Sequence, residues 1–140
     1  MSELFTIRSK CLALSLRRAA RRIGRLYDDV LRPLDINNGQ FSLLAMLAAR
    51  DDWSMQVLAE AMGLDQSSLS AAIKPLLRRE LVLTTVADDD RRLRLLRLTA
   101  SGRTLVEQAI PLWRTAQAQA ERLLDERSPD DVRAALRMLA

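Results

Sequence analysis

The sequence predicts a mainly α-helical fold with one small β-hairpin, for three reasons. Leu, Arg and Ala, which are all strong helix formers, make up nearly half of the 140 residues. Apolar residues recur at helical spacing along most of the chain, which has only four Gly and four Pro. Residues 81–98 instead hold two β-prone segments around a polar turn. The length fits one domain, residues 1–140.

A long helix is predicted at the N-terminal end, over about residues 5–33. Its apolar residues fall at Leu12, Leu16 and Ala19 and continue to Val30 with spacings of three and four, which favours packing on another helix. Pro33 then ends or kinks it. The next helix is expected to begin at Asn37 or Asn38, because an Asn side chain accepts a hydrogen bond from a free backbone N–H.

Two short helices follow, separated by a tight turn. Ser54 is the expected N-cap of the first, and Gly63 suits the left-handed position after its last residue. Asp65 is the expected cap of the second, which we place at about residues 66–79. Helix, glycine turn and helix in this order are typical of a helix-turn-helix.

The remaining segments predict a hairpin and two more helices. Residues 81–86 and 92–98 form the two strands, with a charged turn between them. Thr99 is the expected cap of a long helix, in which Pro111 should cause a kink or a break. Ser128 and Pro129 predict the start of a last helix that runs to the end of the chain.

Composition excludes several classes of function. The chain has no His and a single Cys, Cys11, so no His-based catalytic site, no His or multi-Cys metal site and no disulfide within the chain is expected. We expect no cofactor and no enzymatic activity. No apolar run is long enough to span a membrane, and no signal peptide is recognisable, so the expected location is the cytoplasm. The net charge of +4 permits an anionic partner without requiring one.

Four motifs in order resemble the MarR family of bacterial transcription regulators. They are Gln40–Leu44, Leu58–Asp65, Ser67–Ser70, and Asp90–Arg92 followed by Leu98–Gly102. The resemblance implies a winged helix-turn-helix lobe over about residues 36–100, with long N- and C-terminal dimerisation helices at about 5–33 and 100–140. It also implies a homodimeric repressor that binds a pseudo-palindromic operator in double-stranded DNA and is relieved by a small ligand.

DNA-binding residues are expected on the second short helix and on the hairpin. Short polar side chains at the start of a helix can bind phosphates and base edges. The candidates are the polar residues Gln66, Ser67, Ser68 and Ser70 and, farther along the helix, the cation Lys74. On the hairpin, the family pattern links an Asp to an Arg that enters the minor groove, here Asp90 and Arg92, with Arg91 and Arg94 as phosphate candidates. Without the motif upstream, these arginines would be read as a solvated hairpin.

Three positions depart from the family pattern. Ala71 stands where many members carry Arg or Asn, which removes a base-reading group. Pro75 lies inside the recognition helix, where we expect a kink. Glu80 stands where the family usually has Gly, so either this residue is left-handed at a cost of about 1 kcal/mol or the turn differs. Ala71, the adjacent Ala72 and Glu80 keep open an alternative, a helical adapter protein that has lost DNA binding.

Two further features each have two interpretations. Cys11 is either a small apolar residue at a helix interface or, as the resemblance implies, a peroxide-sensing thiol in a one-Cys redox repressor. The family also implies a site for a small aromatic or anionic ligand, to which Arg17, Phe41 and Trp53 are candidates. The alternative is that the aromatic residues belong to the core.

Overall fold

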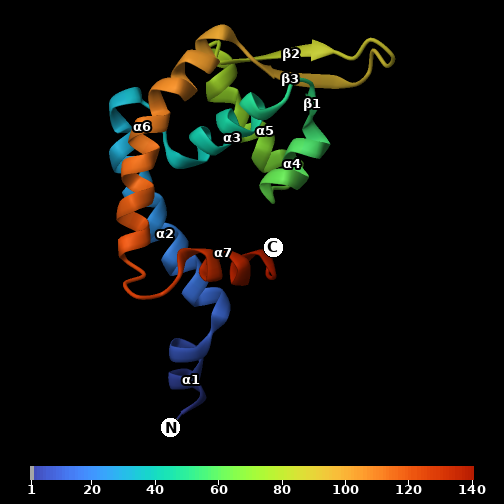
Figure 1. Ribbon diagram of the computed structural model, residues 1–140. Helices are drawn as coiled ribbons and strands as arrows, with labels where there is room; N and C mark the ends of the chain where they lie inside the picture. The colour runs from blue at the N-terminus through green and yellow to red at the C-terminus, as the bar shows by residue number, and fades with distance from the viewer. Residues whose placement is uncertain (1) are drawn as a thin grey trace.

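The computed structural model describes residues 2–140 as a compact lobe on a helical stem (Figure 1). The stem consists of α1 (Glu3–Lys10), α2 (Leu12–Leu31), α6 (Ala100–Arg122) and α7 (Pro129–Arg137). The lobe consists of η1 (Arg32–Leu34), α3 (Asn38–Ala49), β1 (Trp53–Ser54), α4 (Met55–Met62), α5 (Gln66–Arg78), β2 (Val82–Val86) and β3 (Arg94–Leu98). The predicted mainly α fold with a β-hairpin is therefore confirmed.

Local capping explains where the lobe helices begin. Asn37 caps α3 in a capping box: its side chain accepts from the Gln40 N–H at 2.8 Å, and its own N–H donates to Gln40 Oε1 at 3.0 Å. Ser54 and Asp65 cap α4 and α5 as predicted, and Gly63 ends α4 in the left-handed conformation. The helix-turn-helix thus follows from side chains close to each helix end.

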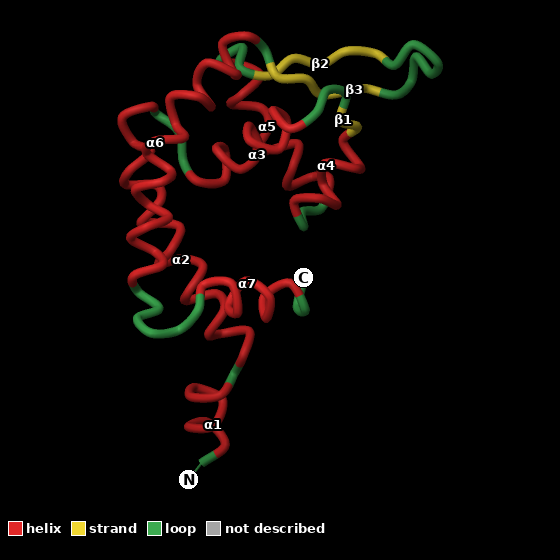
Figure 2. The backbone as a smooth tube through the Cα atoms, in the orientation of Figure 1, coloured by secondary structure: helices red, strands yellow, loops and turns green. Residues whose placement is uncertain are grey.

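The sheet has three antiparallel strands in the order β1-β3-β2 (Figure 2). The hairpin pairs Val82 with Leu98 and Val86 with Arg94. The sequence prediction missed β1, in which Trp53 pairs with Leu96, because two residues are too short to produce an alternating pattern. This short strand joins the start of the helix-turn-helix to the hairpin.

Two apolar clusters hold these parts together. The larger one fills the lobe and includes Leu44, Leu58, Leu69 and Leu96, all essentially inaccessible to solvent. The second joins lobe to stem through Leu31, Ile36, Phe41 and Ala109. Since both clusters include residues of α3, this helix connects the lobe core to the stem.

The stem differs from the predicted single helix before Pro33. Cys11 has an extended backbone, with φ −69° and ψ 111°, and separates α1 from α2. Helix α1 extends away from the rest of the chain (Figure 1), and Leu4, Phe5 and Ile7 on it are exposed. Within residues 2–140, no helix is both long and apolar enough to cross a membrane.

The two internal prolines leave their helices unbroken. Pro75 lies within α5 and Pro111 within α6, so of the two outcomes predicted at Pro111, a kink or a break, the break does not occur. A proline leaves the carbonyl four residues earlier without its helical partner. Those residues, Ala71 and Glu107, are exposed, so water can satisfy the carbonyls.

Candidate nucleic-acid interface

The first turn of α5 is organised by its capping carboxylate. Asp65 accepts hydrogen bonds from the Ser68 N–H at 2.8 Å, the Ser67 hydroxyl at 2.8 Å and the Ser68 hydroxyl at 2.9 Å. The bond from the Ser68 N–H, followed by those from the two hydroxyls, lowers the pKa of Asp65 to about 2. The hydroxyl hydrogens of Ser67 and Ser68 are therefore held by Asp65 and do not point to an external acceptor.

The other predicted residues of α5 form one row along the helix. Gln66, Ser70 and Lys74 are spaced four residues apart, so they share a face; Gln66 and Lys74 are exposed and Ser70 is half-buried. Leu69, Ile73 and Leu76 lie on the side of the helix next to this row and are buried in the lobe. Packing of that side leaves Gln66 and Lys74 exposed to solvent.

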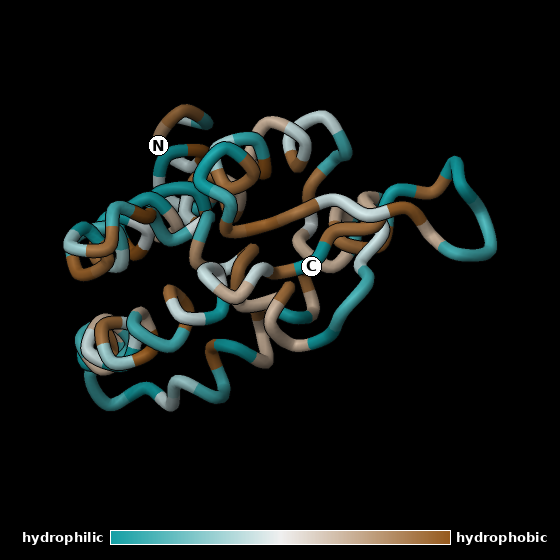
Figure 3. The backbone as a smooth tube through the Cα atoms, turned by 90° about the horizontal axis from the view of Figure 1, so that it is seen from above, coloured by the Kyte–Doolittle hydropathy of each residue, from teal (hydrophilic) through white to brown (hydrophobic). Residues whose placement is uncertain are grey.

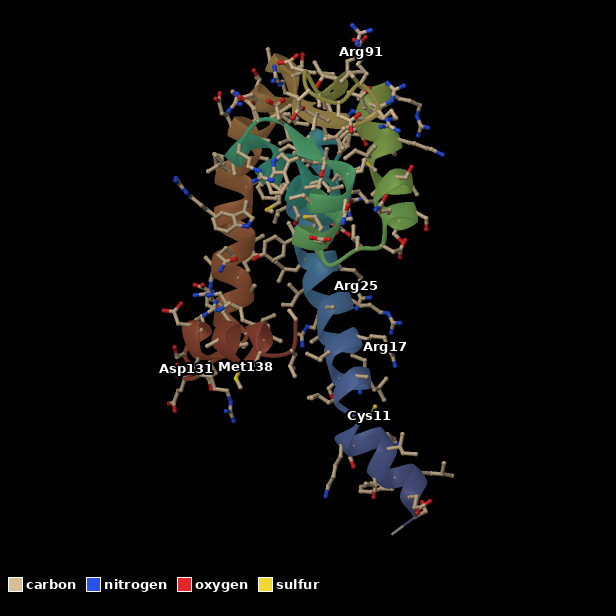
Figure 4. The ribbon with its side chains drawn as sticks, turned by 90° about the vertical axis from the view of Figure 1, so that its right-hand side faces the viewer. Cys11, Arg17, Arg25, Arg91, Asp131 and Met138 are labelled. Atoms are coloured by element: carbon tan, nitrogen blue, oxygen red, sulfur yellow. The ribbon has the colours of Figure 1, made fainter. Side chains whose placement is uncertain are left out.

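The hairpin tip has the predicted link between an acid and an arginine. Asp90 Oδ1 accepts from the backbone N–H of Arg92 at 3.0 Å and lies 3.7 Å from Arg92 Nε. Arg91 and Arg94 are exposed, and Arg91 projects from the outer end of the molecule (Figure 4). Figure 3 shows the tip as a hydrophilic loop beyond the rest of the lobe.

Arg97 on the same hairpin has a different role from its neighbours. Its guanidinium donates to Asp52 Oδ1 at 2.6 Å, and Asp52 lies in the segment that leads into β1. The hydrogen bond to Asp52 and the negative charge of the Asp52 carboxylate raise the pKa of Arg97. This ion pair links β3 to the segment before β1. Nearer the tip, the ion pair within residues 2–140 is that of Arg92 with Asp90.

Sequence reasoning missed Arg79, which follows the last residue of α5. Its guanidinium donates to the backbone oxygens of Leu34 and Asp35, in the connection between α2 and α3. No local pattern relates these residues, because the hydrogen-bonded groups are 44 and 45 positions apart. Arg79 holds the end of the candidate recognition helix against the connection between α2 and α3.

A cavity of about 800 Å³ lies where the stem meets the lobe. It is lined from α2, α3, α4 and α6 by Ala20, Ile23, Gly24, Tyr27, Asn38, Phe41, Ser42, Ala45, Met46, Met62 and Trp113. The α2 lining residues are three or four positions apart, so helical periodicity indicates that they share one face of α2. Periodicity does not indicate which residues of α3, α4 and α6 lie opposite that face. Met62 is the last residue of α4, just before the turn into α5.

Comparison with known proteins assigns the fold to a family. The family model described as MarR family matches residues 34–93. The structure of the M. tuberculosis transcriptional regulator MosR in complex with DNA is 33% identical, with a TM-score of 0.85 and coverage of 93% of both chains. The chain belongs to the MarR family. Its winged helix-turn-helix is accordingly that of a DNA-binding transcription regulator rather than an enzyme.

Two other solved structures are similar to this MarR-family chain. Bordetella bronchiseptica BpsR, studied for the regulation of its DNA binding by 6-hydroxynicotinic acid, is 25% identical with a TM-score of 0.79, over 94% of this chain and 91% of BpsR. The S. aureus MepR–DNA complex shares the fold at 23% identity, with a TM-score of 0.79 over 91% of this chain and 95% of MepR. No curated protein sequence matches significantly.

The predicted ligand residues of this MarR-family protein do not come together. Phe41 lines the cavity, but Trp53 is buried in the lobe core, where the Arg50 guanidinium lies 3.9 Å from the centre of its ring. Arg17 lies on α2 and is not among the residues that line this cavity. Periodicity does not tell which face of a helix meets which neighbour, so the sequence could not show that Trp113 lines the cavity with Phe41.

Cys11 lies at the junction between α1 and α2, far from the hairpin (Figure 4). Its side chain is half-exposed and forms no disulfide. Whether Cys11 senses peroxide therefore stays a prediction.

Proposed function

We propose that this chain acts in the cytoplasm as a homodimeric repressor that binds a pseudo-palindromic site in double-stranded DNA. The observation that carries the proposal is the outward row Gln66, Ser70 and Lys74 on α5, together with the arginine tip of the hairpin. A helix of this kind fits a major groove about 12 Å wide, while the hairpin extends to the flanking backbone.

The polar row of α5 would divide its contacts between bases and phosphates. The Gln66 amide has the donor and acceptor pair that matches the N6 and N7 of adenine. Lys74, two turns farther along, would reach a phosphate. Ser67 and Ser68 would contribute mainly by holding Asp65, which keeps the first turn of α5 ordered. With Ala71 between these residues, direct base readout rests on few side chains.

The hairpin tip would add contacts outside the major groove. Asp90 orients Arg92 through its backbone N–H, and this leaves most of the guanidinium donors for DNA. We assign Arg92 to the minor groove, and Arg91 and Arg94 to adjacent phosphates. Such contacts release counterions, so binding should weaken as salt rises.

A second copy would cover the apolar surface of the stem. Leu4 on α1 is 77% exposed and Met138 after α7 is 87% exposed. Exposed apolar surface of this kind is typical of a protein–protein interface. An open groove of about 880 Å³ between α2, α6 and α7 has apolar lining residues that include Ile23, Leu123 and Leu136, together with arginines of α2 and the Glu121–Arg133 pair. A dimer built on this stem would place two lobes on two half-sites, about one DNA turn or a multiple apart.

A small ligand in the cavity between stem and lobe would relieve repression. Met62 lines that cavity and is followed by Gly63, so a ligand there contacts the helix-turn-helix directly. A ligand that fits only one position of α4 and α5 would shift the protein toward that position. The related BpsR, whose DNA binding is regulated by 6-hydroxynicotinic acid, supports this part of the proposal.

Selection of genomic DNA fragments by the purified protein, followed by fluorescence anisotropy on the enriched sequence, tests the proposal. We expect paired half-sites, affinity that falls as salt rises, and a dimer in sedimentation at micromolar concentration. A folded monomer at that concentration would contradict the dimer. Failure to enrich any sequence would contradict specific DNA binding.

A further inference from the structure

We propose that the cavity between stem and lobe selects a neutral aromatic ligand over an anionic one of the same shape. The inference rests on the proposed function, in which this cavity is the effector site, and specifies the chemistry of the effector. It depends on three features of the cavity: its apolar walls, its lack of charged lining residues, and the hydrogen bonds its polar groups already make.

The walls suit a flat apolar molecule. Phe41 and Met46 of α3, Met62 of α4 and Trp113 of α6 converge on the cavity from different helices. Aromatic rings and thioethers make favourable contacts with an aromatic ligand. The volume of about 800 Å³ is within the range of small-molecule sites.

Within residues 2–140, no charged side chain lines the cavity. The lining residue Asn38 is hydrogen-bonded to a carboxylate: Asp28 Oδ1 accepts from the Asn38 N–H and from Asn38 Nδ2, both at 2.7 Å. The same Asn38 amide also donates to the Gly24 oxygen at 3.3 Å. The donors of Asn38 are therefore engaged within the protein, beside a carboxylate that would repel an anionic ligand.

Tyr27, the other polar group of the α2 wall, is engaged in the same way. Its hydroxyl donates to Gln117 Oε1, and Gln117 Nε2 donates to Glu121 at 2.8 Å. Burial raises the pKa of Tyr27, the nearby Glu121 raises it further, and Arg133 partly opposes them. Arg133 is itself paired with Glu121 at 3.0 Å. Tyr27 thus stays a neutral phenol whose hydrogen is already donated.

The arginines of α2 do not compensate for this lack of positive charge. Arg18, Arg21, Arg22 and Arg25 line the groove toward α7, which adjoins the cavity at Ile23 and Tyr27, but none of these arginines lines the cavity itself. The remaining polar lining residue is Ser42, whose single exposed hydroxyl is neutral. A carboxylate in the cavity would lose its hydration without gaining a cation, which is unfavourable.

Calorimetric titration of the full-length protein with 2-naphthamide and with 2-naphthoate near neutral pH, without DNA, tests the proposal. The two probes share a ring system and differ in the charge of one small group. We expect 2-naphthamide to bind about ten-fold or more tightly than 2-naphthoate, since losing an ion's hydration without a partner costs more than 1.4 kcal/mol. Equal affinity, tighter binding of 2-naphthoate, or no binding of 2-naphthamide would overturn the inference.

Two variants locate the selectivity. Ser42→Lys puts a cation at the edge of the cavity and should reduce or reverse the preference for 2-naphthamide. Ala49→Lys adds the same charge to an exposed position of α3 that lines no cavity, and should leave the preference unchanged. An unchanged preference in Ser42→Lys, with an unaltered melting curve, would place binding elsewhere and overturn the inference.

DNA binding is measured separately, by anisotropy on a selected fragment with and without 2-naphthamide. Loss of DNA affinity on addition of 2-naphthamide supports the cavity as the effector site. If the protein binds DNA but neither probe, the ligand inference fails while the DNA-binding function stands. If 2-naphthamide binds and no DNA is selected, the proposed function fails while the selectivity of the cavity stands.

Discussion

The guanidinium of Arg79 donates a 2.6 Å hydrogen bond to the backbone oxygen of Asp35. Asp35 has a positive φ of 54° at the end of η1, which turns its segment toward α5. A second bond of 3.3 Å reaches Leu34. Since Arg79 follows α5 directly, this contact ties the end of the candidate recognition helix to the connection between α2 and α3, and we expect Arg79 to position α5 rather than to contact DNA.

Replacing Arg79 with Ala should weaken DNA binding without changing its dependence on salt. The free energy of unfolding should fall by about 1 kcal/mol or less, because the lost hydrogen bonds are exposed. Anisotropy at several salt concentrations measures affinity and slope together. Lys74→Ala is the comparison variant: loss of a phosphate contact there should reduce the slope by about 0.9. A similar drop for Arg79→Ala would show that Arg79 contacts DNA.

Arg92→Ala should weaken binding to a selected DNA site by about ten-fold, with little change in melting temperature. The reason is that Arg92 is 96% exposed in its side chain and contributes only a weak contact with Asp90 to the folded protein. Anisotropy and thermal unfolding measure the two effects. Arg114→Ala, an exposed arginine of α6, is the control for loss of charge. Unchanged affinity in Arg92→Ala would show that the assignment of the hairpin tip is wrong.

Asp65 should make stability depend on pH in the acid range. Its pKa is lowered from 3.8 to about 2 in the folded protein, so its contribution is complete above about pH 4 and is lost as the pH falls toward 2. Urea unfolding at neutral pH and at several acid values measures this. Asp65→Asn keeps an oxygen acceptor for capping but does not titrate, so its unfolding midpoint should fall less steeply with acid. Equal acid dependence in both proteins would contradict the assigned role.

Gly102→Ala should destabilise the protein strongly. A Cβ at this position would lie 2.1 Å from the Leu81 backbone oxygen and 2.7 Å from Leu98 Cδ1. We expect a loss of about 2–3 kcal/mol, as in other overpacked sites, because the backbone cannot move aside easily. Gly39→Ala is the matched control: its nearest contact would be an ordinary 3.4 Å to Asn37, and the substitution should be neutral or stabilising. Chemical denaturation compares the two, and equal stability would contradict the close approach.

Features that depend on neighbouring residues could be predicted from the sequence. Ser54, Asp65, Thr99 and Ser128 each cap the expected helix, because capping involves atoms only two or three residues apart. The left-handed backbone at Glu80, one of two options left open, is present with φ 56°. The backbone oxygen of Glu80 accepts from the Thr99 hydroxyl at 2.7 Å, so the N-cap residue of α6 supports this turn.

The sequence by itself determined the order of helices, the helix-turn-helix, the hairpin with its Asp90–Arg92 link, and the family. Only the tertiary structure decided that Arg79 holds Asp35, that Trp53 lies in the lobe core, and that Trp113 packs in the same apolar cluster as Phe41 and lines the same cavity. Capping, turns and periodicity arise within a few residues of chain. Which faces meet across the fold depends instead on how helices distant in sequence pack together.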